Sequence, residues 1–178
     1  MNTRWGFFTL CAFLFWAKTI FVYLVDFHLG VSGIYQYFVL LINPIATTLL
    51  IFSIALYIKR TLPAYLCLFL LYTANSVLLL ISVIYYREFT DFMTINVIFG
   101  YSSVSQGLST SSFSMVKPQD IAIIGDLIVV LILLLLKKIK LDERPIVRKQ
   151  AVAMTSFSLF FLMLNITCLL YTSDAADD

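Results

Sequence analysis

The sequence predicts an all-α membrane protein, folded as a bundle of five transmembrane helices. Of its 178 residues, 61% are hydrophobic and 12% are charged, and the mean hydropathy of +0.97 lies far outside the range of soluble domains. A bilayer core about 30 Å thick requires about 20 apolar residues of helix. Five apolar runs approach that length, near residues 5–26, 35–58, 62–86, 120–136 and 151–171.

The first run is expected to stay in the membrane as a span. A cleaved signal peptide has a shorter apolar region followed by a small-residue cleavage site, and neither is clear at this N-terminus. The run gives way to "DFHLGVSGIYQYFVLLINP" at 26–44. Gly30 and Gly33 are expected to let the chain reverse tightly there, and Tyr35 and Tyr37 to anchor its return at the membrane boundary.

Pro44 lies inside the second apolar run. A proline in a helix removes the backbone hydrogen bond to the carbonyl four residues earlier, here that of Leu40. We therefore expect a kink near Pro44, with Asn43 available to satisfy a freed backbone group.

Lys59 and Arg60 separate the second and third runs, and Pro63 is placed where a helix tolerates proline, in its first turn. The connection at 87–119 is the longest. Its first part, "REFTDFMTINVIF", predicts a short interfacial helix on the outer surface between the third and fourth spans. Its second part, "GYSSVSQGLSTSSFS", has the composition of a flexible loop.

The fourth run starts at "KPQD", with Pro118 near the first turn and Asp120 suited to the positive end of the helix. Before the fifth run, residues 137–150 are densely charged. Alternating the spans across the membrane divides the basic residues outside the spans nine to two, which places the N-terminus in the cytoplasm and the C-terminus outside. The nine are Arg4, Lys59, Arg60, Lys137, Lys138, Lys140, Arg144, Arg148 and Lys149, and the two are Arg87 and Lys117.

No motif for catalysis, nucleotide binding or metal binding is found in the chain. Nothing indicates a nucleic-acid partner. The single histidine, His28, is interpreted as a polar side chain in an interfacial turn rather than as a base or metal ligand. The three cysteines are interpreted as small apolar residues. We therefore assign no catalytic, cofactor-binding or metal-binding residue in this chain.

Two ionisable residues fall inside predicted spans, where an unpaired charge is costly. Lys18 lies eight residues before Asp26, and Asp126 lies six residues after Asp120, which gives both a depth of roughly 10 Å from the outer boundary. We predict an ion pair between Lys18 and Asp126 that holds the first and fourth spans together. The alternative is that Lys18 extends outward and Asp126 contacts only Ser or Tyr hydroxyls.

The cluster "YYREFTDF" at 85–92 lies at the predicted outer boundary. Tyr86, Arg87 and Asp91 are candidates for contacts with a lipid headgroup, because an arginine beside aromatic rings suits a phosphate. The alternative is a solvated anchor at the interface.

Three stretches carry a resemblance to a known family: "KTIFVYLVDFHLGVSGIYQYFVLLINP" (18–44), "LLYTANSVLLLISVIYYREFTDFMT" (70–94) and "KPQDIAIIGDLIVVLI" (117–132). Together they resemble the N-terminal membrane domain of lipoteichoic acid synthases. The resemblance covers about 18–166. It rests on the Asp-Phe-x-Leu-Gly-Val-x-Gly turn with its following Asn-Pro, the Tyr-Tyr-Arg-x-Phe-x-Asp-Phe cluster, and the acids that open the fourth span.

The resemblance implies an anchor of five helices followed by an extracellular, sulfatase-like catalytic domain. That domain is expected to use a threonine nucleophile and a manganese ion to transfer glycerophosphate from phosphatidylglycerol to a chain on a glycolipid anchor. No position of this chain matches those catalytic residues, so the catalytic domain is expected to be absent here. The implied location is the bacterial cell membrane.

Residues 168–178, "CLLYTSDAADD", resemble a translated sequencing adapter rather than the family's continuation. We expect the anchor to comprise 1–167 and this tail to be non-native. Two alternatives remain: the anchor of a related phosphoethanolamine or phosphoglycerol transferase, and a small stand-alone membrane scaffold or transporter subunit.

Overall fold

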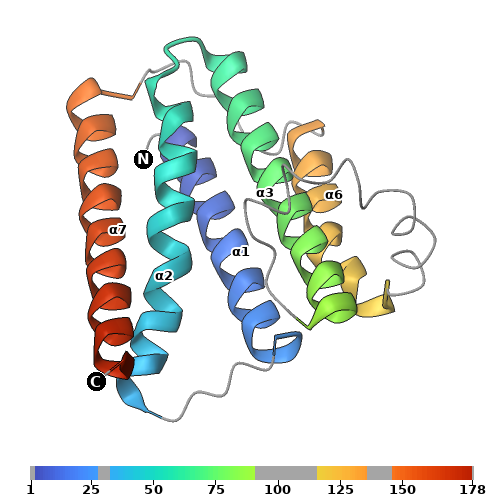
Figure 1. The fold of residues 1–178 in the computed structure, drawn as a ribbon. Coiled ribbons are helices and arrows are strands. Elements are labelled where there is room, and N and C mark those ends of the chain that lie inside the picture. Colours follow the sequence, from blue (N-terminus) through green and yellow to red (C-terminus); the bar gives the residue numbers. More distant parts are fainter. Residues whose placement is uncertain (1–2, 28–32, 91–115, 136–145, 178) are drawn as a thin grey trace, which may run out of the picture.

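The structure, a computed structural model, describes residues 3–27, 33–90, 116–135 and 146–177. All regular elements in these ranges are helices (Figure 1), which confirms the all-α class. Four helices are long and apolar enough to cross a membrane, and a fifth apolar helix, Ile123–Leu135, is shorter. The four long spans are Arg4–Val25, Gln36–Tyr57, Thr61–Arg87 and Arg148–Thr167.

Helices α1 (Thr3–Val25) and α2 (Ile34–Ser53) correspond to the first two apolar runs, and a 3-10 turn, η1 (Ile54–Tyr57), completes the second. Gly33 precedes α2 in an extended conformation (φ −139°), and a Cβ there would meet no atom within 4 Å. A residue with a Cβ therefore adopts this backbone without strain or clash, and the expected need for glycine at position 33 was wrong. His28 and Gly30 lie outside the described residues.

Helix α2 continues through Pro44, which is buried. The hydroxyl of Thr48 donates to the carbonyl oxygen of Pro44 at 2.5 Å. From α1, the indole Nε1 of Trp16 donates to the carbonyl oxygen of Leu41 at 2.8 Å. Leu41 belongs to the turn that precedes the proline, so a tryptophan of α1 supplies a donor where the helical ladder is weakened. The bend near Pro44 and the capping role of Asn43 stay predictions.

Helix α3 (Thr61–Phe89) carries Pro63 in its first turn, as expected, and runs three residues beyond the predicted end at 86. It ends at Thr90, whose φ of 53° is left-handed. This conformation is uncommon for a β-branched residue and breaks the helix. The stretch predicted as an interfacial helix begins at Arg87, and its first three residues belong to α3. The rest of that stretch and the Ser-rich loop fall mainly in 91–115, outside the described residues.

The remaining elements are η2 (Pro118–Asp120), α6 (Ile121–Leu135) and α7 (Arg148–Asp177). Helix neighbours follow the order α7, α2, α1, α3, α6 across the bundle (Figure 1). The last helix, α7, therefore lies beside α2, and α6 lies beside α3.

The core consists mainly of large apolar side chains from α1, α2 and α3. Phe8, Phe52 and Tyr72 are fully buried within it, and the rings of Phe52 and Tyr72 pack edge to face with centroids 6.2 Å apart. A second, smaller cluster joins α1, α3 and α6 at the other end of the bundle and contains Val22, Phe27, Val83 and Ile123.

Helix α7 packs on α2 through a narrow seam. Among its described side chains, only Ala151, Ser158 and Asn165 are buried. Their spacing of seven residues keeps them on one face, as in coiled-coil packing. Small side chains at such a seam let two membrane helices approach closely.

Candidate functional site: two buried charge clusters

The first cluster, which we name the inner cluster, is built around Lys18 of α1 and Asp126 of α6. The Nζ of Lys18 lies 2.9 Å from Oδ2 and 3.2 Å from Oδ1 of Asp126. The lysine side chain is 9% exposed and the aspartate 21%. The structure thus brings together the two residues that the sequence singled out as a pair.

Helix α3 completes the inner cluster with Tyr72 and Ser76. The Nζ of Lys18 donates to Oγ of Ser76 at 2.6 Å and lies 4.3 Å from the centroid of the Tyr72 ring. The Tyr72 hydroxyl donates to Oδ2 of Asp126. Asp126 therefore binds both Lys18, as predicted, and a tyrosine hydroxyl, which the alternative had offered in place of the ion pair.

The second cluster, the outer cluster, consists of Arg87 of α3 between Asp26 and Asp120. The two terminal nitrogens of Arg87 bind the two oxygens of Asp120 at 2.7 and 2.8 Å, a bidentate geometry. Nη2 also donates to Oδ1 of Asp26. All three side chains are less than 10% exposed. Three elements that are far apart in sequence meet at one guanidinium.

Both clusters join the same three parts of the chain: α1 with the turn after it, α3, and η2 with α6. On α3, Ser76 and Arg87 are eleven residues apart, close to three 3.6-residue turns, so this helix presents both polar groups on one face. Lys18 lies within α1, whereas Asp26 lies in the turn directly after that helix ends at Val25. One arrangement of these segments therefore satisfies both clusters at once.

Asp120 lies in η2, before the apolar helix begins. Burial by itself would raise the pKa of its carboxyl group. Hydrogen bonds from the Arg87 guanidinium and from the backbone N–H of Lys117 outweigh that effect and hold the pKa below its usual value. Asp120 therefore stays ionised at neutral pH.

The predicted headgroup residues have other partners in this structure. Tyr86 donates its hydroxyl to the carbonyl oxygen of Phe27 at 3.3 Å, and their rings pack edge to face. Arg87 is enclosed by carboxylates, and Asp91 lies outside the described residues. The charge of Arg87 already has protein ligands, and its contact with a lipid headgroup stays a prediction.

Sequence reasoning missed Asp26 and Asp120 as ligands of Arg87, and Tyr72 and Ser76 as partners of the ion pair. One signal was available, because Asp26, Arg87 and Asp120 flank three spans at the same predicted boundary. Asn75 of α3 donates its Nδ2 to the carbonyl oxygen of Leu71 on its own helix and takes no part in either cluster.

The described residues do not fit a manganese site. No group of three or more His, Cys, Asp or Glu side chains in this part of the chain could hold a metal ion, and both clusters pair each acid with a cation. What the arrangement can do is hold α1, α3 and α6 in one fixed register.

An all-helical membrane protein with ion pairs between its helices is the class that the fold and site define. Residues 1–174 match the family described as the lipoteichoic acid synthase N-terminal domain. The chain belongs to this family, which confirms the predicted resemblance.

Individual relatives agree with the family match. The chain is 36% identical over 166 residues to lipoteichoic acid synthase of Staphylococcus saprophyticus, and 34% identical over 163 residues to that of Staphylococcus aureus strain USA300. It is 32% identical over 128 residues to lipoteichoic acid synthase 2 of Bacillus subtilis. These alignments cover 91%, 89% and 72% of this chain but 25%, 25% and 20% of the relatives. The chain thus spans about a quarter of their length, and no solved structure matches it.

Proposed function

We propose that this chain is the membrane anchor of a glycerophosphotransferase of the lipoteichoic acid synthase type. The observation that carries the proposal is the match of residues 1–174 to the N-terminal domain of that family. The full enzyme would transfer glycerophosphate from phosphatidylglycerol to a polymer on a glycolipid. The threonine nucleophile and the manganese ion would belong to its extracellular catalytic domain.

The proposed anchor crosses the bilayer five times, with α6 as the fourth span. Helix α6 has 15 described residues of strongly apolar sequence, which is short for a span. Two features support a membrane position for it. It packs against α3, and Asp126 on its buried side is neutralised by Lys18. An unpaired acid at that depth would be costly.

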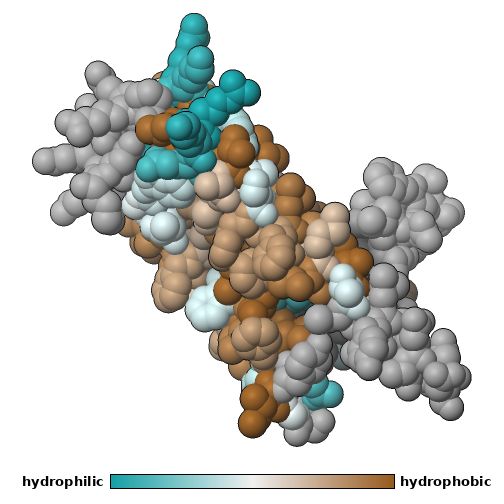
Figure 2. All heavy atoms as spheres, turned by 90° about the vertical axis from the view of Figure 1, so that its left-hand side faces the viewer, coloured by the Kyte–Doolittle hydropathy of each residue, from teal (hydrophilic) through white to brown (hydrophobic). Residues whose placement is uncertain are grey.

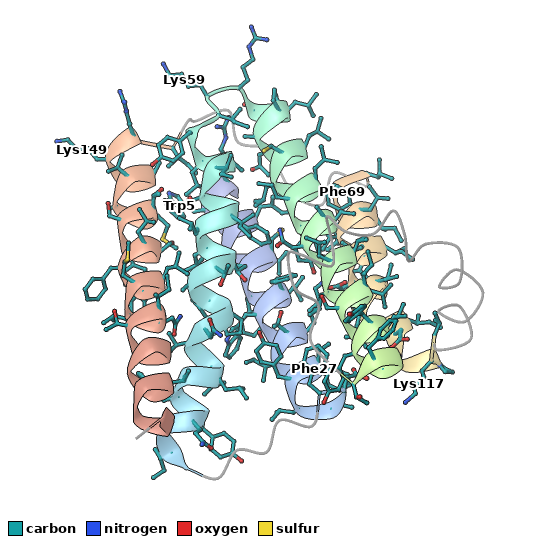
Figure 3. All side chains as sticks on the ribbon, in the orientation of Figure 1. Trp5, Phe27, Lys59, Phe69, Lys117 and Lys149 are labelled. Carbon is teal, nitrogen blue, oxygen red and sulfur yellow. The ribbon has the colours of Figure 1, made fainter. Side chains whose placement is uncertain are left out.

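The proposed orientation has the N-terminus in the cytoplasm and the C-terminus outside. Lys59 and Lys149 lie at one end of the bundle, and Phe27 and Lys117 lie at the other (Figure 3). Arg60 and Arg148 adjoin the two lysines in sequence, so the first end carries more of the described cations. The positive-inside rule favours that end as cytoplasmic.

In this proposal the outer cluster serves the catalytic half. It binds the outer ends of α1 and α3 to the start of α6, and so holds the external surface in a fixed arrangement beneath the catalytic domain. The inner cluster sets the register of the same helices deeper in the membrane.

A chimera tests the proposal. Residues 1–167 would replace the matching membrane part of the Staphylococcus aureus enzyme in cells depleted of their own copy, and cellular glycerophosphate polymer would be measured by immunoblot. Polymer formation is expected. A chimera that is abundant and membrane-inserted but makes no polymer would contradict the proposed function. Alkaline phosphatase fused after residue 90 should be active, and fused after residue 60 inactive; the reverse pattern would contradict the orientation.

A further inference from the structure

Five oxygen atoms of the inner cluster lie around the ammonium group of Lys18. Within 3.4 Å of its Nζ are both carboxylate oxygens of Asp126 (2.9 and 3.2 Å), Oγ of Ser76 (2.6 Å), the hydroxyl of Tyr72 (3.3 Å) and the carbonyl oxygen of Ile123 (3.4 Å). All five oxygens belong to α3 and α6, whereas the lysine belongs to α1. Two helices thus form a cage of oxygens, and a third helix supplies the cation.

Aromatic rings add to the enclosure of this ammonium group. Nζ of Lys18 lies 4.3 Å from the centroid of the Tyr72 ring and 5.5 Å from that of Phe15, distances at which a cation is attracted to a ring face. Lys18 is 9% exposed, and Figure 2 shows a broad band of hydrophobic residues on the α7 side of the bundle. A cation at this depth depends on the cage, because hydrocarbon offers it no ligands.

The composition of the cage suits a primary ammonium ion. Of the described groups within hydrogen-bonding distance of Nζ, Asp126 alone is charged, so a divalent ion would leave one positive charge unbalanced. The five oxygens outnumber the three N–H donors of an ammonium group, so the ion can turn and still find acceptors. The outer cluster differs, because there the two oxygens of Asp120 receive the planar fork of Arg87. The two clusters therefore match different cations.

We propose that the inner cluster is a recognition site for a primary ammonium ion, which the side chain of Lys18 occupies in this protein. The part of Lys18 beyond Cβ has the structure of a propylammonium ion. Alanine at position 18 would leave the oxygen cage with a cavity of that shape, and free propylammonium should bind there. The site does not depend on the proposed transferase activity, because its ligands and its cation all belong to the membrane helices.

Thermal unfolding of the full chain in detergent tests the site, with propylammonium chloride as the probe. Lys18→Ala should be less stable than wild type, and propylammonium at about ten times its dissociation constant should raise the melting temperature of this variant by about 3–5 °C. Two compounds separate shape from charge, because 1-propanol has the shape without the charge and tetramethylammonium has the charge without an N–H donor. Neither compound should stabilise Lys18→Ala.

Wild type and two further variants are the controls. Wild type should not respond to propylammonium, because its site is occupied. Lys18→Met fills the site with an uncharged chain, and Lys59→Ala removes an exposed lysine outside it, so neither should respond. Helicity by circular dichroism verifies that each variant is folded.

Three results would overturn the proposal. The first is that propylammonium does not stabilise Lys18→Ala, and the second is that it stabilises wild type or Lys18→Met equally, which would show a general effect of the amine. The third applies if Lys18→Ala does not fold in ordinary buffer. It should then be recovered in folded form when propylammonium is present during purification, and failure in both buffers would contradict the site.

Discussion

The two halves of the bundle are held together by different forces. Helices α1, α3 and α6 share two charge clusters, each with at least one group that is more than nine-tenths buried. Helices α2 and α7 meet through small side chains at Ala151, Ser158 and Asn165, with one hydroxyl contact of 2.9 Å between Tyr57 and Thr155. In a bilayer, lipid is as apolar as a helix surface, so packing and polar contacts must supply the association energy. The first half should therefore fail abruptly when one charge is lost, and the second should weaken gradually.

The largest effect is expected from Arg87→Gln. This change leaves Asp26 and Asp120 close together and buried without their shared cation, so stability should fall by about 3–5 kcal/mol. Thermal unfolding in detergent would measure the loss. The control is Lys117→Gln, at an exposed lysine of the same end, which should have little effect. A mild phenotype for Arg87→Gln would show that the outer cluster does not hold the three helices.

The inner cluster should respond to single and double substitutions differently. Asp126→Asn leaves the ammonium group of Lys18 in the membrane and is expected to destabilise the protein by about 3 kcal/mol. Lys18→Met together with Asp126→Asn removes both charges and should restore part of that loss. If the double variant is no more stable than either single variant, the two residues do not act as a pair.

In the α2–α7 half, Ser158→Leu should cost about 2 kcal/mol, because Ser158 is fully buried and a larger side chain would force the helices apart. Helix proximity can be measured by cross-linking engineered cysteines on α2 and α7. Leu159→Phe, at an exposed neighbour, is the control. Equal cross-linking in Ser158→Leu and wild type would argue against a close seam.

Trp16→Phe should have a smaller effect, about 1 kcal/mol, because it removes one hydrogen bond to Leu41 and keeps an aromatic ring. Combining it with Pro44→Ala should reduce the penalty, since a helix without the proline ring can bond the Leu41 carbonyl fully through the backbone N–H of Ile45. Thermal stability of the single and double variants measures this coupling. Simple additivity would mean that Trp16 does not compensate for Pro44.

The smallest expected effect depends on pH. Because Arg87 lowers the pKa of Asp120 in the folded protein, the carboxylate stabilises the fold above the unfolded-state pKa of about 4, and this stabilisation is lost as the pH falls through the lower folded-state pKa. The difference in melting temperature between wild type and Asp120→Asn should stay constant from about pH 7 to 5 and shrink below about pH 4. A difference already lost at pH 6 would contradict the cluster geometry.

The lengths and positions of the apolar runs in the sequence determine the location of this protein and the bounds of most of its helices. Composition predicts the membrane, and run length predicts the helices to within a few residues at most ends, because burying the backbone in lipid leaves helix as the only solution for such runs. The pairing of Lys18 with Asp126 could also be predicted from the sequence. A charge at that depth requires a partner, and the chain offers one candidate at a matching depth.

Tertiary structure decided which helices are neighbours, and with them the partners of the other polar groups that bond between helices. The ligands of Arg87 come from the ends of two other elements, and nothing local in the sequence of α3 indicates them. Trp16 contacts Leu41, and Trp5 contacts Gln150, only because α1 lies against α2 and near α7. The physical reason is that apolar periodicity specifies a helix and its depth but not its neighbour, whereas hydrogen bonds and ion pairs between helices require one particular rotation and register.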